Sequence, residues 1–196
     1  WLGMTVFGQP GFSEDWTLYR WAHWGDASFN VGFLLDSLSA VMLLVVTFVS
    51  TLVHIYSIGY MQGDAGYPRF FACISLFTFA MLALVLANNL LVLFFGWEGV
   101  GLVSYLLIGF WFKKSTAAAG SLKAFLVNRV GDFGLILGVA LVWQCFGSLH
   151  YADIFAQLAS LQAMLLAPVS SAVPFSVVTL IALLLFVGAM GKSAQI

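Results

Sequence analysis

Long apolar runs alternate with short polar stretches along this chain, and each run has about the length needed to span a membrane. The runs cover approximately residues 31–58, 70–87, 88–114, 117–146 and 175–190. A helix needs about 20 apolar residues to cross the hydrocarbon core of a bilayer. The pattern therefore predicts an all-α, polytopic bundle of about five transmembrane helices.

Two stretches are expected outside the bilayer. Residues 1–30 contain four tryptophans, and tryptophan concentrates at membrane–water interfaces, so we expect an interfacial loop there. Residues 151–166 have apolar side chains on one helical face and polar side chains on the opposite face, which predicts an amphipathic helix. Pro168 and Pro174 bracket a break before the last run.

Basic residues determine the expected orientation. Arg69, Lys113 and Lys114 follow the first and third runs, on one side of the membrane if every run crosses it, whereas the other side has only Arg20. By the positive-inside rule the first set faces the cytoplasm or matrix. The predicted organisation is an outward interfacial segment (1–30), four transmembrane helices (31–146), an outward loop with the amphipathic helix (147–175) and the start of a further, truncated transmembrane helix (176–196).

The third run contains one carboxylate, Glu98. A charged side chain near the bilayer centre costs about 2.5–3.5 kcal/mol, which a simple anchor does not require. Gly101, Tyr105 and Gly109 lie within about 60° of Glu98 on a helix. This small, polar face would let another helix or a water chain approach the carboxylate, so we expect Glu98 to hold or pass a proton.

Further ionisable groups lie in the fourth and fifth runs. Arg129 and Asp132 are spaced to pair within one helix, while Lys123 points about 180° away from Asp132. Lys192 is the natural partner for Glu98, because pairing would control whether each group holds a proton. A static salt bridge between two helices is the alternative. Gly134 and Gly138 form a small-xxx-small pattern that favours helix packing.

Composition narrows the functional classes. Of all residues 62% are hydrophobic and 8% are charged, whereas a soluble domain has about 25% charged residues. A net charge of −1 without a basic patch argues against a nucleic-acid partner. Cys73 and Cys145 are far apart, and His23, His54 and His150 match no metal-ligand spacing. We expect neither a cofactor nor a metal in this chain.

Several motifs together closely resemble one family. They are GWEGVGLVSYLLIGFW (96–111), KAFLVNRVGDFG (123–134), GAMGKSAQI (188–196), LVHIYSIGYM (52–61) and RFFACISLFTFAML (69–82). They are similar to motifs of the L chain of bacterial respiratory complex I, the chain 5 counterpart in mitochondria. The resemblance covers approximately residues 32–196.

The resemblance implies an antiporter-like, non-redox subunit of the proton-translocating NADH–quinone oxidoreductase. It implies a coupling pair of Glu98 and Lys192, with Asp132 also implicated and Lys123 and Arg129 beside it. NADH, FMN, Fe–S clusters and quinone would be bound by other subunits. The implied partners are the other membrane subunits, the bilayer and protons, in the inner membrane of a bacterium or a mitochondrion.

The sequence is compatible with three functional hypotheses, of which the complex I subunit is the first. Mrp-type multisubunit cation/proton antiporters share the same glutamate and lysine, so a subunit of that kind is the alternative. A purely structural membrane subunit, whose charges only fix helix packing, is the third. The family continues past the GKSAQ motif with a broken helix, further lysines and a lateral helix, so we expect this chain to be a fragment.

Overall fold

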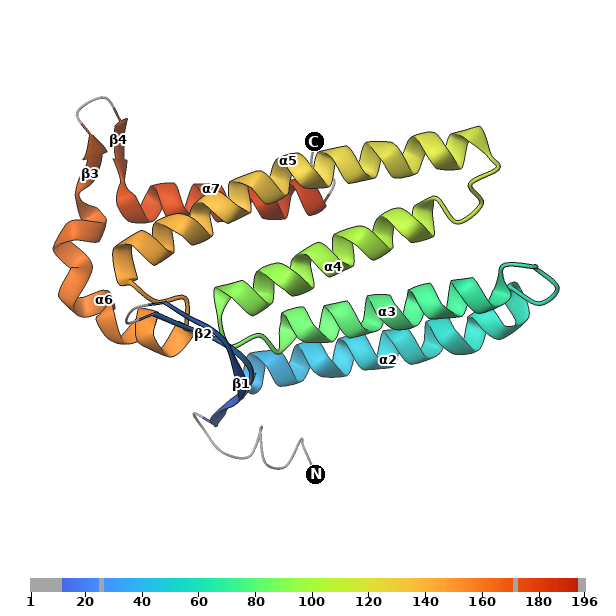
Figure 1. Cartoon of the computed structure of the whole chain (residues 1–196), viewed down its shortest axis with the longest axis horizontal. Helices are drawn as coiled ribbons and strands as arrows, with labels where there is room; N and C mark the ends of the chain where they lie inside the picture. The colour runs from blue at the N-terminus through green and yellow to red at the C-terminus, as the bar shows by residue number, and fades with distance from the viewer. Residues whose placement is uncertain (1–11, 25–26, 171–172, 194–196) are drawn as a thin grey trace. The chain divides into compact units, whose positions relative to one another are not determined.

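The computed structural model describes residues 12–24, 27–170 and 173–193. Among these residues, four helices are long and apolar enough to cross a membrane, and one apolar helix is shorter. This confirms the predicted all-α, polytopic fold. The helices are α2 (Ser37–Tyr60), α3 (Tyr67–Val85), α4 (Leu90–Ile108), α5 (Ser115–Phe146), α6 (Tyr151–Leu166) and the shorter α7 (Val177–Lys192), as Figure 1 shows.

The chain divides into two compact units. Unit 1 takes the described residues of 1–19, 31–88 and 92–125, and unit 2 takes those of 20–30, 89–91 and 126–196. Unit 1 therefore contains α2, α3, nearly all of α4 and the beginning of α5. Unit 2 contains the remainder of α5 together with α6 and α7.

Two short sheets accompany the helices. β1 (Ser13–Trp24) pairs with β2 (Ala27–Asp36), and β3 (Pro168–Ser170) pairs antiparallel with β4 (Val173–Ser176). The first sheet replaces the loop predicted for residues 1–30, because its aromatic and β-branched side chains favour strands. The part of that prediction concerning residues 1–11 lies outside the described residues, as does the end of the predicted last segment (176–196), residues 194–196.

The first long helix begins later than the apolar run predicts. Residues 31–36 belong to β2, and α2 starts only at Ser37. Asp36 ends the strand by forming a capping box: its Oδ1 accepts a hydrogen bond from the Ser39 N–H at 2.7 Å, and the Asp36 N–H donates to Ser39 Oγ at 2.8 Å. The side chain of Asp36 thus satisfies N–H groups that a helix start leaves unpaired, and so fixes this start.

Asn88 and Asn89, between α3 and α4, form hydrogen bonds to the first sheet. In unit 1, Asn88 is fully buried, and its Nδ2 donates to Asp15 Oδ1 at 2.7 Å. In unit 2, Asn89 Nδ2 donates to the carbonyl oxygen of Asn30 at 2.9 Å. Each asparagine therefore satisfies its buried amide through a strand residue that is distant in sequence.

The turn between α2 and α3 is fastened to the segment between α4 and α5, both in unit 1. Gly63 has a positive φ of 86°, which glycine adopts without steric cost. Asp64 Oδ1 accepts from the Gly66 N–H at 2.6 Å, and its Oδ2 accepts from Trp111 Nε1 at 3.2 Å. These two hydrogen bonds and the charge of Arg69 hold the pKa of Asp64 below its usual value of 3.8.

Asp64→Ala should loosen this turn. Loss of the acceptor should make the Gly66 amide exchange with solvent about threefold to tenfold faster. Because the folded pKa is the lower one, the stabilisation is fully present above pH 3.8 and is lost only as the pH falls through the lowered value. Hydrogen exchange of the Gly66 peptide at pH 7 measures the effect. Asp153→Ala is the control, and equal exchange in both variants would contradict the expectation.

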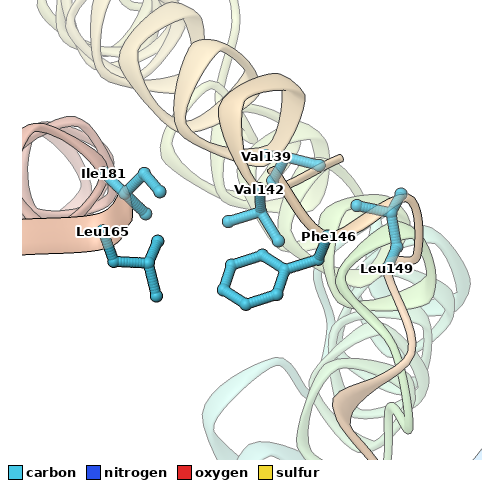
Figure 2. Packing of buried hydrophobic residues seen from close by; sticks show 6 residues of the cluster. All are labelled: Val139, Val142, Phe146, Leu149, Leu165 and Ile181. Carbon is cyan, nitrogen blue, oxygen red and sulfur yellow. The ribbon is translucent and has the colours of Figure 1, made fainter. Parts of the chain in front are cut away.

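Unit 2 is organised around an apolar core. Figure 2 shows Val142 and Phe146 of α5 pointing toward Leu165 of α6 and Ile181 of α7. Each of these four side chains is less than 9% exposed. Burial of these apolar side chains is the main favourable contribution to packing the three helices together. Phe29 extends the core by stacking on Trp143 with ring centroids 5.2 Å apart.

The amphipathic helix α6 has the bounds that its pattern predicts, Tyr151–Leu166. Its apolar face is divided between two environments. Ile154, Leu161 and Leu165 pack in the core of unit 2, whereas Phe155 is 68% exposed. Most of the predicted apolar face therefore contacts helices of the chain itself.

Candidate ion-translocation site

Glu98 lies near the middle of α4 and is half-buried in unit 1. Two glycines of α4, Gly96 and Gly99, face α3. A Cβ on Gly96 would lie 2.7 Å from the backbone nitrogen of Leu84, and a Cβ on Gly99 would lie 3.1 Å from the Cβ of Ala80. At about 100° per residue Glu98 points away from the side that Gly96 presents to α3.

The face that Glu98 occupies is the one on which α5 begins to pack. The rings of Tyr105 and Phe125 lie 5.5 Å apart, and a Cβ on Gly109 would lie 3.1 Å from Ser121 Oγ. Helical periodicity places Glu98 within about 20° of both Tyr105 and Gly109. In unit 1, α5 contacts this face at Tyr105, which stays 37% exposed. The role expected of the face stays a prediction.

In unit 2, α5 and α7 approach each other through glycine. A Cβ on Gly131 would lie 3.2 Å from the Cα of Gly191, and a Cβ on Gly191 would lie 3.0 Å from the Cα of Gly131. A Cβ on Gly188 would lie 2.8 Å from the Cβ of Leu135. Small residues allow such close backbone contact between transmembrane helices.

The pattern of Gly134 and Gly138 contributes to the same contact, as predicted. A Cβ on Gly134 would lie 2.7 Å from Val187 Cγ1, and a Cβ on Gly138 would lie 2.9 Å from Leu185 Cδ2. Branched side chains of α7 thus occupy the space that these two glycines leave on α5. The glycine contact extends over two turns of α5.

Three charged residues lie where the two glycines meet. Asp132 follows Gly131 and is only 6% exposed, and its Oδ2 lies 3.7 Å from Arg129 Nη1. Lys192 follows Gly191, is half-buried and lies within electrostatic range of both Asp132 and Arg129. Arg129, Asp132 and Lys192 are called the α5–α7 charge cluster below.

The remaining predicted site residues are distributed over both units. Lys123 is exposed whereas Asp132 is buried, which agrees with their expected positions on opposite sides of α5. Glu98 belongs to unit 1 and Lys192 to unit 2. The pairing of Glu98 with Lys192 stays a prediction. Among the described residues, no group of three or more His, Cys, Asp or Glu side chains could hold a metal ion.

A hydrogen-bonded set between α2 and α3 was missed by reasoning from the sequence. Ser50 Oγ lies 2.6 Å from Thr78 Oγ1, and His54 Nε2 lies 3.3 Å from Ser75 Oγ. His54 Nδ1 is 2.8 Å from the carbonyl oxygen of Ser50. The signal was available, because Ser50 and His54 are four residues apart and Ser75 and Thr78 are three apart, so each pair shares a helix face.

Comparison with known proteins identifies relatives of this chain. A family model described as the N-terminus of chain 5 of NADH–ubiquinone oxidoreductase (complex I) matches residues 21–71, and one described as NADH:quinone oxidoreductase/Mrp antiporter, transmembrane region, matches residues 87–196. NADH-quinone oxidoreductase subunit L of Neisseria meningitidis (strain MC58) is 56% identical over 92% of this chain and 27% of its own length. The chain belongs to the subunit L, or chain 5, family.

Other members of the subunit L family are named chain 5. NADH-ubiquinone oxidoreductase chain 5 of Triticum aestivum is 52% identical over the whole of this chain and 29% of its own length. The corresponding protein of Chondrus crispus is 49% identical over 91% of this chain and 27% of its own length. The chain thus spans little more than a quarter of these relatives' length. The resemblance inferred from the motifs is confirmed.

Solved structures share the fold at lower identity. The Mrp complex from Dietzia sp. contains a chain with a TM-score of 0.75 and 24% identity, covering 97% of this chain and 19% of that one. An archaeal membrane-bound sulfane sulfur reductase gives a TM-score of 0.66 at 19% identity, covering 93% of this chain and 26% of its own. This chain therefore shares its fold with part of one chain in each of these assemblies.

Proposed function

We propose that this chain is part of the proton-translocating membrane arm of an NADH–quinone oxidoreductase, in an energy-coupling membrane and in contact with other membrane subunits. It would be a non-redox part of the enzyme: other subunits bind NADH, FMN, Fe–S clusters and quinone, and quinone reduction supplies the energy. Glu98 and Lys192 would carry the proton. Membership of the subunit L family supports this assignment.

The α5–α7 charge cluster is the observation that carries the proposal. Lys192 ends an apolar helix, and the charges that act on it come from a buried carboxylate and a guanidinium of the neighbouring apolar helix. Ionisable groups inside spanning helices usually pair with each other and mark ion pathways. An amine on which one anion and one cation act is sensitive to small movements of either. This suits a step that must alternate between two charge states.

The cluster suggests how Lys192 could take up and release a proton. With the Asp132 carboxylate close by, the protonated amine is stabilised by the opposite charge. Movement of that carboxylate toward Arg129 would withdraw this stabilisation and expose the amine to the guanidinium charge, favouring release of the proton. Glu98, half-buried on α4, would act as the other proton-holding station, and Tyr105 as a polar group on its face.

Glu98→Gln and Lys192→Ala test the assignment. Each should lower NADH-driven proton translocation by more than about tenfold, because a group that transfers a proton directly cannot be replaced by one that does not titrate. The measurement uses the full-length protein in its isolated complex, reconstituted in vesicles, with proton uptake followed after addition of NADH. Arg20→Gln removes an exposed charge and should leave translocation unchanged.

Two outcomes would support the other readings. Unchanged translocation in both Glu98→Gln and Lys192→Ala would mean that the charges serve only to pack helices. Cation/proton exchange that proceeds without NADH, in cells lacking their own Mrp antiporter, would assign the chain to an Mrp-type antiporter. The fold similarity to the Mrp complex is the observation that supports an Mrp-type antiporter as the second candidate function.

A further inference from the structure

Two cavities of unit 1 share one basic residue. The larger, of about 440 Å³, lies between the α2–α3 turn and the segment joining α4 to α5. The smaller, of about 300 Å³, lies between α3, α4 and the beginning of α5. Arg69, Phe110 and Phe112 line both cavities. Whatever occupies one cavity would therefore meet the same guanidinium as an occupant of the other.

Arg69 is held in a defined position on the wall of these cavities. Its Nη2 donates to the carbonyl oxygen of Phe110 at 2.6 Å. Its guanidinium carbon lies 4.5 Å from the centroid of the Phe110 ring and 5.2 Å from that of Phe112. A planar guanidinium fixed by one hydrogen bond and two rings can present its other N–H groups to phosphate oxygens, which Arg binds in a bidentate manner.

The larger cavity has a net positive lining. Arg69, Lys113 and Lys114 contribute three cations, against the single carboxylate of Asp64. The oxygens of Asp64 already accept hydrogen bonds from the Gly66 amide and the Trp111 indole. Lys113 and Lys114 are exposed, and Lys114 Nζ lies 4.8 Å from the Trp111 ring centroid. Three cations against one carboxylate leave a net charge of +2 around the cavity, which would attract an anion.

The smaller cavity is mainly apolar. Cys73, Leu106, Phe110 and Phe112 contribute to its lining beside Arg69. A basic cavity and an apolar cavity that meet at one arginine match an amphiphile with an anionic head and a hydrocarbon tail. A free phosphate ion would need only the basic part. Basic pockets beside transmembrane helices are a known way to bind anionic lipid headgroups.

We propose that this region binds one anionic phospholipid, independently of the proposed proton pathway. Its phosphate lies against Arg69, Lys113 and Lys114 in the larger cavity, and the start of an acyl chain enters the smaller one. Trp111 and Tyr67 stand at the same end of the helices, in the position that aromatic side chains favour at the headgroup level.

Photolabelling of the full-length protein in its isolated complex tests this site. The complex is placed in phosphatidylcholine nanodiscs with an equal small fraction of a phosphatidylglycerol or a phosphatidylcholine probe carrying a diazirine in the acyl chain. Labelled peptides are then mapped by mass spectrometry. The phosphatidylglycerol probe should label peptides covering residues 69–73 and 105–112 several-fold more than the phosphatidylcholine probe does.

Charge removal should reduce this preference stepwise. Lys113→Gln, Lys114→Gln and Arg69→Gln should each weaken labelling about fivefold, since each removes one cation near the headgroup. The two lysine variants change exposed side chains and avoid the hydrogen bond of Arg69, so they test the proposal even if Arg69→Gln disturbs folding. Arg20→Gln, an exposed basic residue outside these cavities, should label like the wild type.

Three results would overturn the proposal. The first is equal labelling by both probes. The second is undiminished labelling when Lys113 and Lys114 are both replaced by glutamine. The third is loss of labelling when inorganic phosphate replaces chloride at constant ionic strength, which would assign the site to free phosphate. None of these readouts depends on proton translocation, so the proposed function can fail without affecting this site.

Discussion

Gly131→Leu should separate α5 from α7 and destabilise unit 2. The leucine Cβ would lie 3.2 Å from the Cα of Gly191 and 3.3 Å from the carbonyl oxygens of Val187 and Gly188. These are backbone atoms, so relief requires one helix to move away from the other. Overpacking of this kind costs about 1–3 kcal/mol or more, and the movement would also take Lys192 away from Asp132.

The effect can be measured as the amount of full-length protein in the isolated complex and as the temperature at which that protein aggregates in detergent. Gly59→Ala is the matched control, because nothing lies within 4 Å of a Cβ at that position of α2. It should be neutral or slightly stabilising, since alanine favours helix more than glycine does. If Gly131→Leu behaves like Gly59→Ala, the close contact between α5 and α7 is not present in the assembled protein.

Asp132→Asn should both destabilise unit 2 and stop proton translocation. It removes the negative charge that Asp132 supplies to two cations, Lys192 and Arg129. Removing one partner of a fully buried ion pair costs about 3–5 kcal/mol. Because the Arg129 side chain is 38% exposed, the cost here should be smaller. The double variant Asp132→Asn/Lys192→Met keeps only Arg129, whose side chain is 38% exposed and can reach polar surroundings. We therefore expect it to regain much of the stability.

The double variant separates a structural role of the cluster from a functional one. Stability is followed by aggregation temperature, and function by NADH-driven proton uptake in vesicles; the difference between single and double variants gives the coupling. We expect stability to recover and translocation to stay below about a tenth of wild type. Asp153→Asn, at an exposed carboxylate of α6, is the control. Recovery of both properties would leave the cluster with packing as its whole function.

Hydrophobic length carried most of the information about the fold. The bounds of α5 and α6 follow from where apolar periodicity begins and ends, and both agree with the structure within two residues. The β1–β2 sheet could not be recognised in the same way. Tryptophans are common both in strands and at membrane surfaces, and the capping role of Asp36, which ends the strand, depends on local geometry rather than on hydrophobicity.

The candidate site was only partly accessible from the sequence, for a related reason. A charge inside an apolar run identifies Glu98, Asp132 and Lys192 individually, but charge alone does not select neighbours. Which groups meet depends on helix crossings, and the crossing of α5 and α7 is set by uncharged residues, Gly131 and Gly191. Those glycines directly precede Asp132 and Lys192. In both helices, the residue that permits close packing is therefore next to the charged residue.

The length of α5 connects this chain to the thickness of its membrane. Its 32 residues extend about 48 Å at a rise of 1.5 Å per residue, whereas a hydrocarbon core measures about 30 Å. The helix must tilt or emerge into the headgroups to accommodate this hydrophobic mismatch. Lys123, eight residues beyond Ser115, is about 12 Å from the start of the helix. Bilayer thickness would then set the depth of Lys123, so lipid acyl length becomes a variable acting on this helix.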